Sequence, residues 1–246
     1  HDQEIDPKIL LKAKNAFELL KEKKAIFIDV RSRTEFNAEH IEGAISFPYT
    51  VIRMTDNYPF KKDSKLILYC GCPHHLSGLS AEELKKKGYP DVNVIDEGYW
   101  GWKAMSFPIF LNPNAPKRTS MSFEGTLARG QEKQAFEDVF LIHPETGQIE
   151  ATRTDAQGKF SMTLHFNGVS MDDKVLLQWG GRDLMSITLA ELKQASILEL
   201  QITKEKNDIE DLEKSLKELK GNSSNYANRI ETLEKELKDF RDREIE

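Results

Sequence analysis

Two cysteines and two histidines lie close together in one short segment of the chain, at Cys70, Cys72, His74 and His75. An apolar run typical of a buried strand ends at Cys70, and a helical pattern begins near Ser77. The N-terminus of a helix presents unpaired N–H groups and a partial positive charge, which favour a thiolate and attract an anion. The segment therefore predicts thiolate chemistry on a small anionic or sulfur-bearing substrate.

Each of these side chains also has a simpler interpretation. Cys70 is either the reactive thiol or a buried structural cysteine, and Cys72 is either a resolving thiol or an exposed loop residue. His74 and His75 would tune the thiolate or donate protons, join the cysteines in binding zinc or copper, or lie on the loop surface. Four ligands this close in sequence do not easily bind one metal, so we predict no metal site and no cofactor. With Cys70 as the catalytic residue, the residues expected to bind substrate or shape the loop are Gly71, Cys72, His74, His75, Leu76 and Ser77.

The composition limits the class of protein. The chain has 246 residues, a length that suits two or three small domains. Its formal net charge of -6, without a basic patch in the sequence, argues against nucleic acid as the main partner. No apolar run approaches the length of a membrane span, so no transmembrane segment is expected. Two cysteines separated by one residue do not make a disulfide framework.

Residues 1–112 alternate between apolar runs and helical patterns, which is typical of a doubly wound α/β domain with a parallel sheet. Asp6 followed by Pro7 is a good start for a helix, because aspartate caps it and proline fits its first position. Gly88-Tyr89-Pro90 would end the helix that follows Cys70. The expected helices cover residues 7–22, 77–87 and 100–105, and residues 33–40 are expected to form a short helix or a turn. The expected strands cover residues 25–30, 44–48, 66–69 and 92–95.

An ordered series of short motifs in this part resembles the rhodanese (sulfurtransferase) family. The series is Asp29-Val30-Arg31-Ser32-x-x-Glu35-Phe36, His40-Ile41-Glu42-Gly43-Ala44-Ile45-Ser46-Phe47-Pro48, Tyr69-Cys70, Gly88-Tyr89, Glu97-Gly98-Tyr99-x-x-Trp102 and Phe107-Pro108. The resemblance implies a catalytic cysteine that carries sulfane sulfur as a persulfide and passes it to a thiol or cyanide. Cys70 matches that cysteine, and Asp29 and Arg31 match the family's acidic-basic pair, which we expect to support the loop.

The loop departs from the pattern of the family, many members of which place arginine after the cysteine. Gly71-Cys72-Pro73-His74-His75-Leu76 contains neither arginine nor lysine, so backbone N–H groups would hold an anion here. Thiosulfate, an organic persulfide, a polysulfide and a protein thiol therefore all stay open as partners. Two other functions also stay open: a binding or scaffold protein of the cell envelope that transfers little or no sulfur, and a Cys/His protein for thiol redox chemistry or metal handling.

Beyond a polar, proline-rich linker at residues 113–120, the pattern changes to short strands separated by turns. Residues 121–193 suggest a small β-sandwich, and Pro144-x-Thr146-Gly147 with Thr154-Asp155-x-x-Gly158-x-Phe160 is similar to the transthyretin-like, carboxypeptidase-regulatory-like sandwiches. That resemblance implies a non-catalytic accessory domain of secreted or envelope proteins. The chain begins at His1 without a Met, so we expect either that a leader has been removed or that the start is trimmed. We therefore expect a periplasmic or other extracytoplasmic protein, with the cytoplasm as the alternative.

The last segment, residues 194–246, has leucine and isoleucine at steps of three and four, with glutamate and lysine between them. Gly221-Asn222-Ser223-Ser224-Asn225 interrupts the steps, so the pattern predicts two coiled-coil helices joined by a turn. A hairpin with one narrow apolar seam is marginal alone. The segment is therefore expected to pack on the rest of the chain, bind a protein partner or self-associate.

Overall fold

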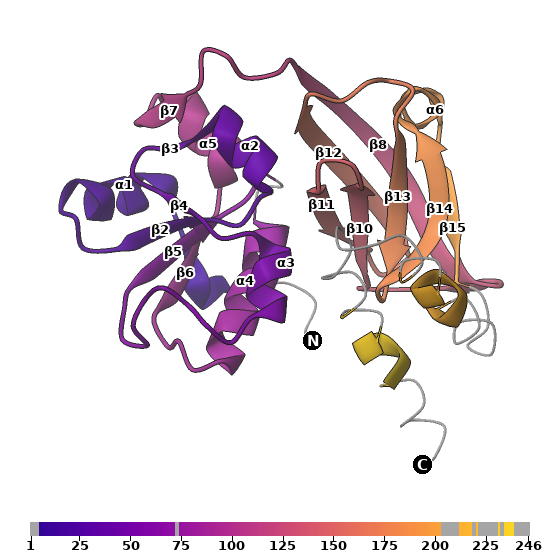
Figure 1. Cartoon of the computed structure of the whole chain (residues 1–246), viewed down its shortest axis with the longest axis horizontal. Helices are drawn as coiled ribbons and strands as arrows, with labels where there is room; N and C mark the ends of the chain where they lie inside the picture. The colour runs from indigo at the N-terminus through magenta and orange to yellow at the C-terminus, as the bar shows by residue number, and fades with distance from the viewer. Residues whose placement is uncertain are drawn as a thin grey trace.

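The computed structural model describes residues 5–71, 74–202, 212–217, 220, 231 and 234–238. It contains an α/β part up to residue 111 and a part rich in β-strands from residue 118 onward, and the two pack against each other (Figure 1). We refer to residues 118–202 as the β region. Within the described residues, no helix is long and apolar enough to span a membrane.

A parallel five-stranded sheet in the order β1-β6-β5-β2-β4 forms the centre of the α/β part. Helices α3 and α4 pack on one face and helices α1 and α5 on the other, as the alternation of strands and helices predicts. The elements are η1 (Pro7–Ile9), β1 (Leu10–Leu11), α1 (Ala13–Lys21), β2 (Ile26–Asp29), α2 (Arg33–Ala38), β3 (Glu39–Ile41), β4 (Ile45–Ser46), α3 (Tyr49–Met54), β5 (Leu66–Tyr69), α4 (His75–Lys86), β6 (Val92–Ile95), α5 (Gly98–Ala104) and β7 (Ile109–Leu111).

Strand β5 is buried on both faces, which explains its unbroken apolar sequence. Leu66 and Leu68 pack toward α3 and α4, whereas Ile67 and Tyr69 pack toward α1 and α5. Full burial of an aliphatic side chain contributes roughly 2 kcal/mol, so this strand is a firm support for the residue that follows it.

The helix predicted over residues 7–22 is wrong in its first third. Asp6 does cap a helix, because its Oδ1 accepts a hydrogen bond from the Lys8 backbone N at 3.0 Å, but that helix is only the short 3-10 turn η1. Leu10 and Leu11 then form β1 and pair with Val94 and Ile95 at the edge of the sheet. Pairing with an existing strand satisfies their backbone groups, and this long-range contact outweighs the local helical pattern.

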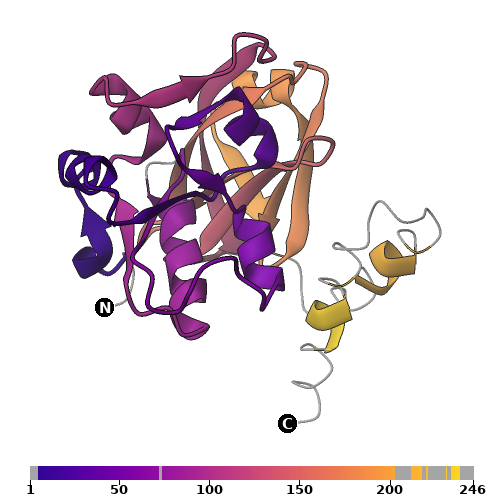
Figure 2. The same ribbon diagram turned by 60° about the vertical axis from the view of Figure 1, so that its left-hand side comes forward.

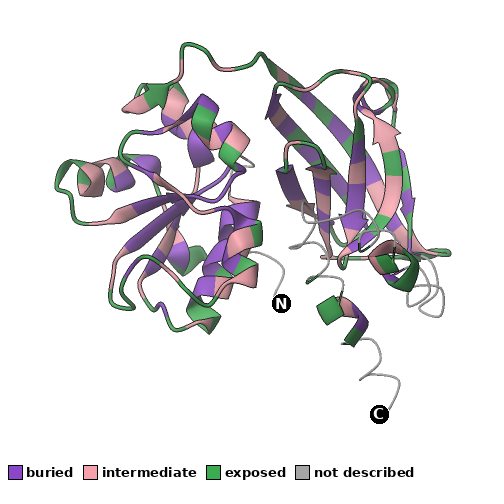
Figure 3. Cartoon of the chain, in the orientation of Figure 1, coloured by how far each residue is buried: buried purple, intermediate pink, exposed green. Residues whose placement is uncertain are grey.

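The β region consists of two sheets with predominantly antiparallel pairing. One has the strand order β11-β10-β13-β14, and the other has the order β12-β8-β15 with β9 paired to β8. The elements are β8 (Arg118–Arg129), β9 (Glu132–Lys133), β10 (Asp138–His143), β11 (Gln148–Arg153), β12 (Lys159–Asn167), β13 (Lys174–Trp179), β14 (Arg182–Thr188), α6 (Leu189–Gln194) and β15 (Leu198–Gln201). Alternate side chains of both sheets meet in one apolar core, as the buried residues of Figure 3 indicate.

Two expected boundaries shift in the structure. Residues 118–120, expected in the linker, begin β8 because they pair with residues 165–167 of β12. Residues 198–201, expected in the helical tail, form β15 and pair in parallel with residues 125–128 of β8. The alternation of Leu198 and Leu200 is a strand pattern that the nearby helical repeat hides. The transthyretin-like resemblance stays a prediction.

Only part of the expected coiled coil lies within the described residues. Residues 212–217 and 234–238 are helical, and Lys220 forms an ion pair with Glu234. These residues lie at one end of the β region (Figure 2), and the Glu236 carboxylate abuts Gly181 in the turn between β13 and β14. The predicted break at residues 221–225 lies outside the described residues, so the coiled coil and its partner stay predictions.

Candidate functional site

Strand β5 places Cys70 at the carboxyl end of the sheet, directly before the loop to α4. Its side chain is fully buried, with 0 % of its surface exposed. The Sγ atom lies 3.3 Å from the Oγ of Ser77, in the first turn of α4. From the start of α5, the Tyr99 backbone N donates a hydrogen bond of 2.8 Å to the Cys70 carbonyl. A strand and two helices therefore fix this cysteine.

Ser77 has one hydroxyl proton and two neighbours that can accept it. Its Oγ donates to the His74 carbonyl at 3.2 Å and also lies within reach of the Cys70 sulfur. A hydroxyl rotates freely about its C–O bond. Ser77 can thus accept from the Cys70 thiol while donating to His74, or turn its proton toward a Cys70 thiolate.

The loop begins with Gly71, and Cys72 and Pro73 lie outside the described residues. A Cβ atom on Gly71 would lie 3.1 Å from Glu150 Oε1 and 3.3 Å from Trp100 Nε1. Both contacts are tighter than ordinary van der Waals distance, so glycine allows the loop to approach the two side chains. Glu150 belongs to β11, which means that the β region contacts the loop at its first residue.

The two loop histidines contact aspartates on different parts of the chain. His74 Nδ1 lies 3.0 Å from the backbone carbonyl of Asp96, in the turn after β6, and 3.1 Å from its Oδ1. His75 Nε2 lies 2.9 Å from Asp138 Oδ1 on β10, and Arg153 Nε donates to the same oxygen at 3.0 Å. Burial alone would raise the pKa of Asp138, but hydrogen bonds from His75 and Arg153 hold it below its ordinary value.

Asp29 and Arg31 form a buried pair beside the sheet, with 0 % and 2 % of their side chains exposed. Arg31 Nη2 donates to Asp29 Oδ2 at 2.8 Å and to the Glu39 carbonyl at 2.7 Å. The guanidinium also lies over the ring of Tyr99, 4.3 Å from its centroid. Burial works to lower the pKa of Arg31, but the Asp29 carboxylate raises it above its ordinary value. These contacts connect the end of β2 to β3 and α5. Helix α5 is also the helix from which the Tyr99 backbone N donates to the Cys70 carbonyl.

The β region covers the edge of the sheet at which Cys70 lies. Ile149 and Ala151 of β11 belong to the same buried apolar cluster as Cys70 and Leu76. Helices α2, α3 and α4 face strands β10, β11 and β12 across this contact (Figure 1). Leu76, expected in the substrate loop, is instead a core residue on which both parts of the chain pack.

Polar and aromatic contacts extend this interface around the site. The rings of Tyr49 and Phe140 stack with centroids 5.9 Å apart, and Thr34 Oγ1 donates to the Thr146 carbonyl at 3.2 Å. Trp100 lies against His165 of β12, with ring centroids 4.4 Å apart. Burial and neighbouring arginines lower the pKa of His165 to about 4, so this ring is neutral at pH 7. The interface therefore places an uncharged imidazole against Trp100, and the guanidinium of Arg118 on β8 lies over the same ring, 4.5 Å from its centroid.

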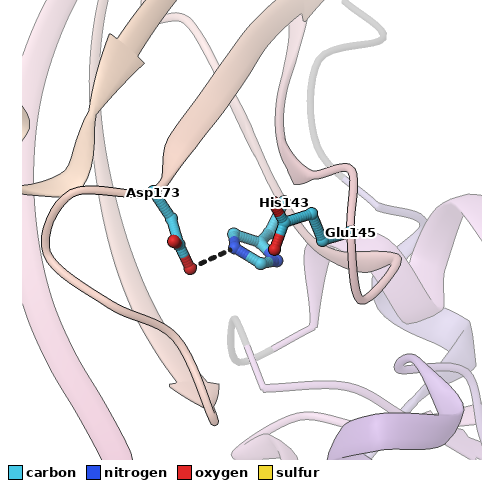
Figure 4. A group of neighbouring side chains, drawn as sticks. All are labelled: His143, Glu145 and Asp173. Carbon is cyan, nitrogen blue, oxygen red and sulfur yellow. Dashed lines mark hydrogen bonds and ion pairs between the residues drawn. The ribbon is translucent and has the colours of Figure 1, made fainter.

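A second group of side chains has the spacing of metal ligands, namely His143, Glu145 and Asp173 (Figure 4). His143 Nε2 lies 2.9 Å from Asp173 Oδ2, and its Nδ1 lies 2.7 Å from the Thr146 hydroxyl. Both ring nitrogens are thus engaged within the protein. We assign His143 a structural role in tying β10 to the turn before β13.

Several residues around Cys70 are absent from the sequence-based site. Asp138, Glu150 and His165 lie far from the cysteine in sequence, and no local motif links them to it. Trp100 is in the α/β part and lies near the loop, but an aromatic residue in a short helix usually indicates packing only. Among these residues, only Glu150 has a feature that could have drawn attention to it, because it is a charged residue at a buried position of a β-strand.

Comparisons with known proteins agree with the α/β part of this fold. A family model described as the rhodanese-like domain matches residues 12–105, and this part of the chain is a rhodanese-like domain. The uncharacterized protein slr1261 of Synechocystis is 27% identical over 108 residues, which are 44% of this chain and 59% of the relative. The chain thus spans about three-fifths of the length of that protein.

Another relative carries the name thiosulfate sulfurtransferase GlpE, from Coxiella burnetii. It is 29% identical over 90 residues, which are 36% of this chain and 81% of the relative. Among solved structures, the rhodanese-like domain of the Alr3790 protein from Anabaena is 20% identical with a TM-score of 0.41. The match covers 44% of this chain and 85% of that one.

Proposed function

We propose that the protein is a sulfurtransferase that carries sulfane sulfur as a persulfide on Cys70. The observation that carries the proposal is the place of this cysteine in a rhodanese-like domain. It follows the central strand β5 and contacts a hydroxyl in the first turn of α4. The name of the Coxiella relative, a thiosulfate sulfurtransferase, supports the same chemistry.

The proposed reaction consists of two displacements on sulfur. The Cys70 thiolate attacks the outer sulfur of a donor, a new S–S bond forms, and the donor's S–S bond breaks with its electron pair on the leaving group. With thiosulfate the leaving group is sulfite, and with an organic persulfide it is a thiolate. An acceptor thiolate or cyanide then attacks the outer sulfur of the Cys70 persulfide and regenerates the thiolate.

Neighbouring residues have supporting roles in this proposal. Ser77 donates its proton to the sulfur of Cys70, and Gly71 lets the loop lie close to its neighbours. His74 and His75 orient the loop through Asp96 and Asp138, and Asp29 with Arg31 stabilises the sheet edge. Cys72 would act as a resolving thiol.

A sulfur-transfer assay with matched variants tests the proposal. Purified wild type is incubated with thiosulfate or a polysulfide as the donor and with cyanide as the acceptor, and thiocyanate is measured. We expect turnover with at least one donor, its loss in Cys70→Ser, and its retention or partial reduction in Cys72→Ser. Retained turnover in purified Cys70→Ser would exclude Cys70 as the sulfur carrier.

A scaffold function is the alternative, and the complete burial of Cys70 beneath β11 favours it. A scaffold would use the joined α/β part and β region as one binding surface, with the cysteine as a core residue. A partner that binds wild type and the Cys70→Ser, Cys72→Ser double variant equally well, together with absent turnover, would support this function. Under both functions, the extracytoplasmic localisation of the protein stays a prediction.

A further inference from the structure

The turn between β10 and β11 places a threonine hydroxyl against a buried histidine. Thr146 Oγ1 lies 2.7 Å from His143 Nδ1. On the other side of the ring, Nε2 lies 2.9 Å from Asp173 Oδ2 (Figure 4). Because a carboxylate only accepts, the proton of the neutral imidazole is on Nε2, and Nδ1 presents its lone pair to the hydroxyl. A hydroxyl, an imidazole and a carboxylate in this order activate an oxygen nucleophile.

The backbone of the turn explains why the hydroxyl and the ring meet. The Gly147 backbone N donates to the His143 carbonyl at 2.9 Å and closes the turn. Its φ of +69° lies in the left-handed region, which glycine adopts without a steric penalty. The α/β part fixes the same turn, because the Thr34 hydroxyl of α2 donates to the Thr146 carbonyl at 3.2 Å. The contact is therefore set by the backbone.

An electrophile lies beside this hydroxyl, namely the side-chain amide of Gln148. Its Nε2 lies 2.8 Å from Thr146 Oγ1. Since the C–N bond of an amide is about 1.3 Å long, the amide carbon Cδ lies within roughly 4.1 Å of the same oxygen. The two side chains are thus close to the separation at which an oxygen attacks a carbonyl carbon.

The backbone of Asn167 holds the Gln148 amide in one orientation. Nε2 of Gln148 donates to the Asn167 carbonyl at 2.9 Å, and Oε1 accepts from the Asn167 N at 2.7 Å. If an oxygen attacked Cδ, negative charge would develop on Oε1. The Asn167 N–H already points at that atom, which is how an oxyanion hole stabilises a tetrahedral intermediate.

Burial protects this group of side chains from water. The Gln148 side chain is 0 % exposed and His143 is 1 % exposed. Exclusion of water limits hydrolysis, so an ester formed here would persist. The contacts of His143 tie neighbouring segments together, and the order of the groups around it goes beyond that structural role.

We propose that Thr146 and Gln148 form an intramolecular ester, with His143 as the general base and ammonia as the leaving group. His143 Nδ1 takes the proton of the Thr146 hydroxyl, and Oγ1 forms a bond to Cδ of Gln148. The bond from Cδ to Nε2 then breaks, and the imidazolium returns the proton to the departing nitrogen. One ammonia leaves, His143 is regenerated, and Asp173 is a positioning residue that fixes the tautomer. This self-modification is independent of Cys70.

The mass of one proteolytic peptide tests the proposal. Cleavage before Asp138 and before Asp155 releases residues 138–154, in which Gln148 is the only residue with a side-chain amide. An ester makes this peptide lighter by one molecule of ammonia. The protein is made by cell-free synthesis, sampled over time, denatured and cleaved, so that the rate of ammonia loss is measured.

We expect the wild-type peptide to lose one ammonia with time and then to form a hydroxamate at Gln148 on treatment with hydroxylamine. Thr146→Val should abolish the loss, whereas Thr146→Ser, which keeps a hydroxyl, should retain it. Thr152→Val is the matched control in the same peptide and should behave as wild type. His143→Gln should slow the loss at least about a hundredfold, as removal of a general base does.

The role of Asp173 has a test of its own. Asp173→Asn should slow the loss of ammonia, and Asp173→Glu, which keeps an acceptor for the imidazole N–H, should restore part of the rate. Equal rates in these two variants would overturn the positioning role.

Two outcomes would overturn the ester itself. One is a wild-type peptide that keeps its full mass at all times, a result that needs no variant and therefore does not depend on whether the variants fold. The other is continued loss of ammonia in Thr146→Val. Neither outcome affects the thiocyanate assay of Cys70, so the proposed sulfur transfer is tested separately.

Discussion

At the scale of single residues, the Ser77 hydroxyl is placed to influence the chemistry of Cys70. Its Oγ lies 3.3 Å from the Cys70 sulfur, and its proton can point to that sulfur or to the His74 carbonyl. A hydrogen bond to the charged form of a group favours that form. Ser77 therefore stabilises the thiolate whenever its proton turns to Cys70.

The first prediction concerns Ser77→Ala. Loss of the hydroxyl should move the midpoint of the pH profile for Cys70 alkylation upward by about one unit, equivalent to roughly 1.4 kcal/mol. Alkylation with iodoacetamide, followed by mass spectrometry over a range of pH, measures the midpoint. Ser80→Ala is the matched control, because the Ser80 hydroxyl donates to the Leu76 carbonyl on the same helix. A midpoint that does not move in Ser77→Ala contradicts the assigned role.

The second prediction concerns the buried pair of Asp29 and Arg31. Asp29→Asn should lower the free energy of unfolding by roughly 3 to 5 kcal/mol, because it leaves the Arg31 guanidinium buried without its counter-charge. Urea denaturation measures the change. Asp91→Asn, which removes the partner of Lys65 at the surface, should cost less than about 1 kcal/mol. If Asp29→Asn and Asp91→Asn lower the free energy of unfolding by the same amount, burial of the Asp29–Arg31 pair does not increase its contribution to stability.

At the scale of elements, helix α2 contains a buried carboxylate that makes stability depend on pH. Ser32 and Glu35 form a capping box at its start, in which Glu35 Oε2 accepts from the Ser32 backbone N at 3.1 Å. Burial raises the pKa of Glu35 to about 7, although Arg31 and Ser32 act to lower it. Between its ordinary value of 4.5 and about 7, the folded protein binds more protons at this group than the unfolded chain.

The third prediction follows from the sign of this difference. The contribution of Glu35 to the free energy of unfolding is complete below its unfolded pKa and is lost as the pH rises through the folded value. Glu35→Gln keeps the capping geometry without the ionisation. Its melting temperature, relative to wild type, should therefore rise by a few degrees between about pH 5 and about pH 8. A difference in melting temperature between Glu35→Gln and wild type that stays constant over this pH range would contradict the raised pKa of Glu35.

Local sequence signals predict the α/β elements well because the parallel strands bury both faces. The continuous apolar run of β5, the end of α4 before Gly88 and the position of Cys70 all follow from neighbouring residues. Leu10–Leu11 and Leu198–Gln201 are different, because each forms a strand only by pairing with a distant one, β6 or β8. The apolar pair Leu10–Leu11 carries no local mark of such a partner, and the alternation in Leu198–Gln201 is hidden by the neighbouring helical repeat.

The residues of the candidate site also fall into two groups, those that the local sequence predicts and those that only the packing of distant segments brings to the site. Cys70 and Ser77 are predictable because one strand end and one helix start bring them together, whereas Asp29 and Arg31, at the end of β2, are predicted from the family resemblance. Glu150 reaches the loop only through the packing of the β region, which residue spacing does not encode.

At the scale of the whole molecule, the β region encloses the cysteine. Cys70 shares its apolar cluster with Ile149 and Ala151, while His75 and Asp138 join the two parts beside it. A reagent can reach the sulfur only after the loop or this interface opens, so the reactivity of Cys70 reports on the interface.

The fourth prediction uses that reactivity. Native Cys70 should react with iodoacetamide at least about tenfold more slowly than the same thiol in the urea-unfolded chain, and Phe140→Ala should accelerate the native reaction. Phe140 stacks on Tyr49 across the interface, so its truncation weakens the contact without touching the loop. Phe110→Ala, an exposed ring on β7, is the control and should leave the rate unchanged. Rapid native alkylation at the unfolded rate would mean that the β region does not protect Cys70.

The measurement that tests the central claim most directly is the mass of the intact protein after incubation with a sulfur donor, followed by peptide mapping. We predict a gain of one sulfur atom that maps to Cys70, disappears on treatment with cyanide and is absent in Cys70→Ser. A gain that maps only to Cys72, or no gain with thiosulfate, a polysulfide or an organic persulfide, would contradict the assignment of Cys70 as the sulfur carrier.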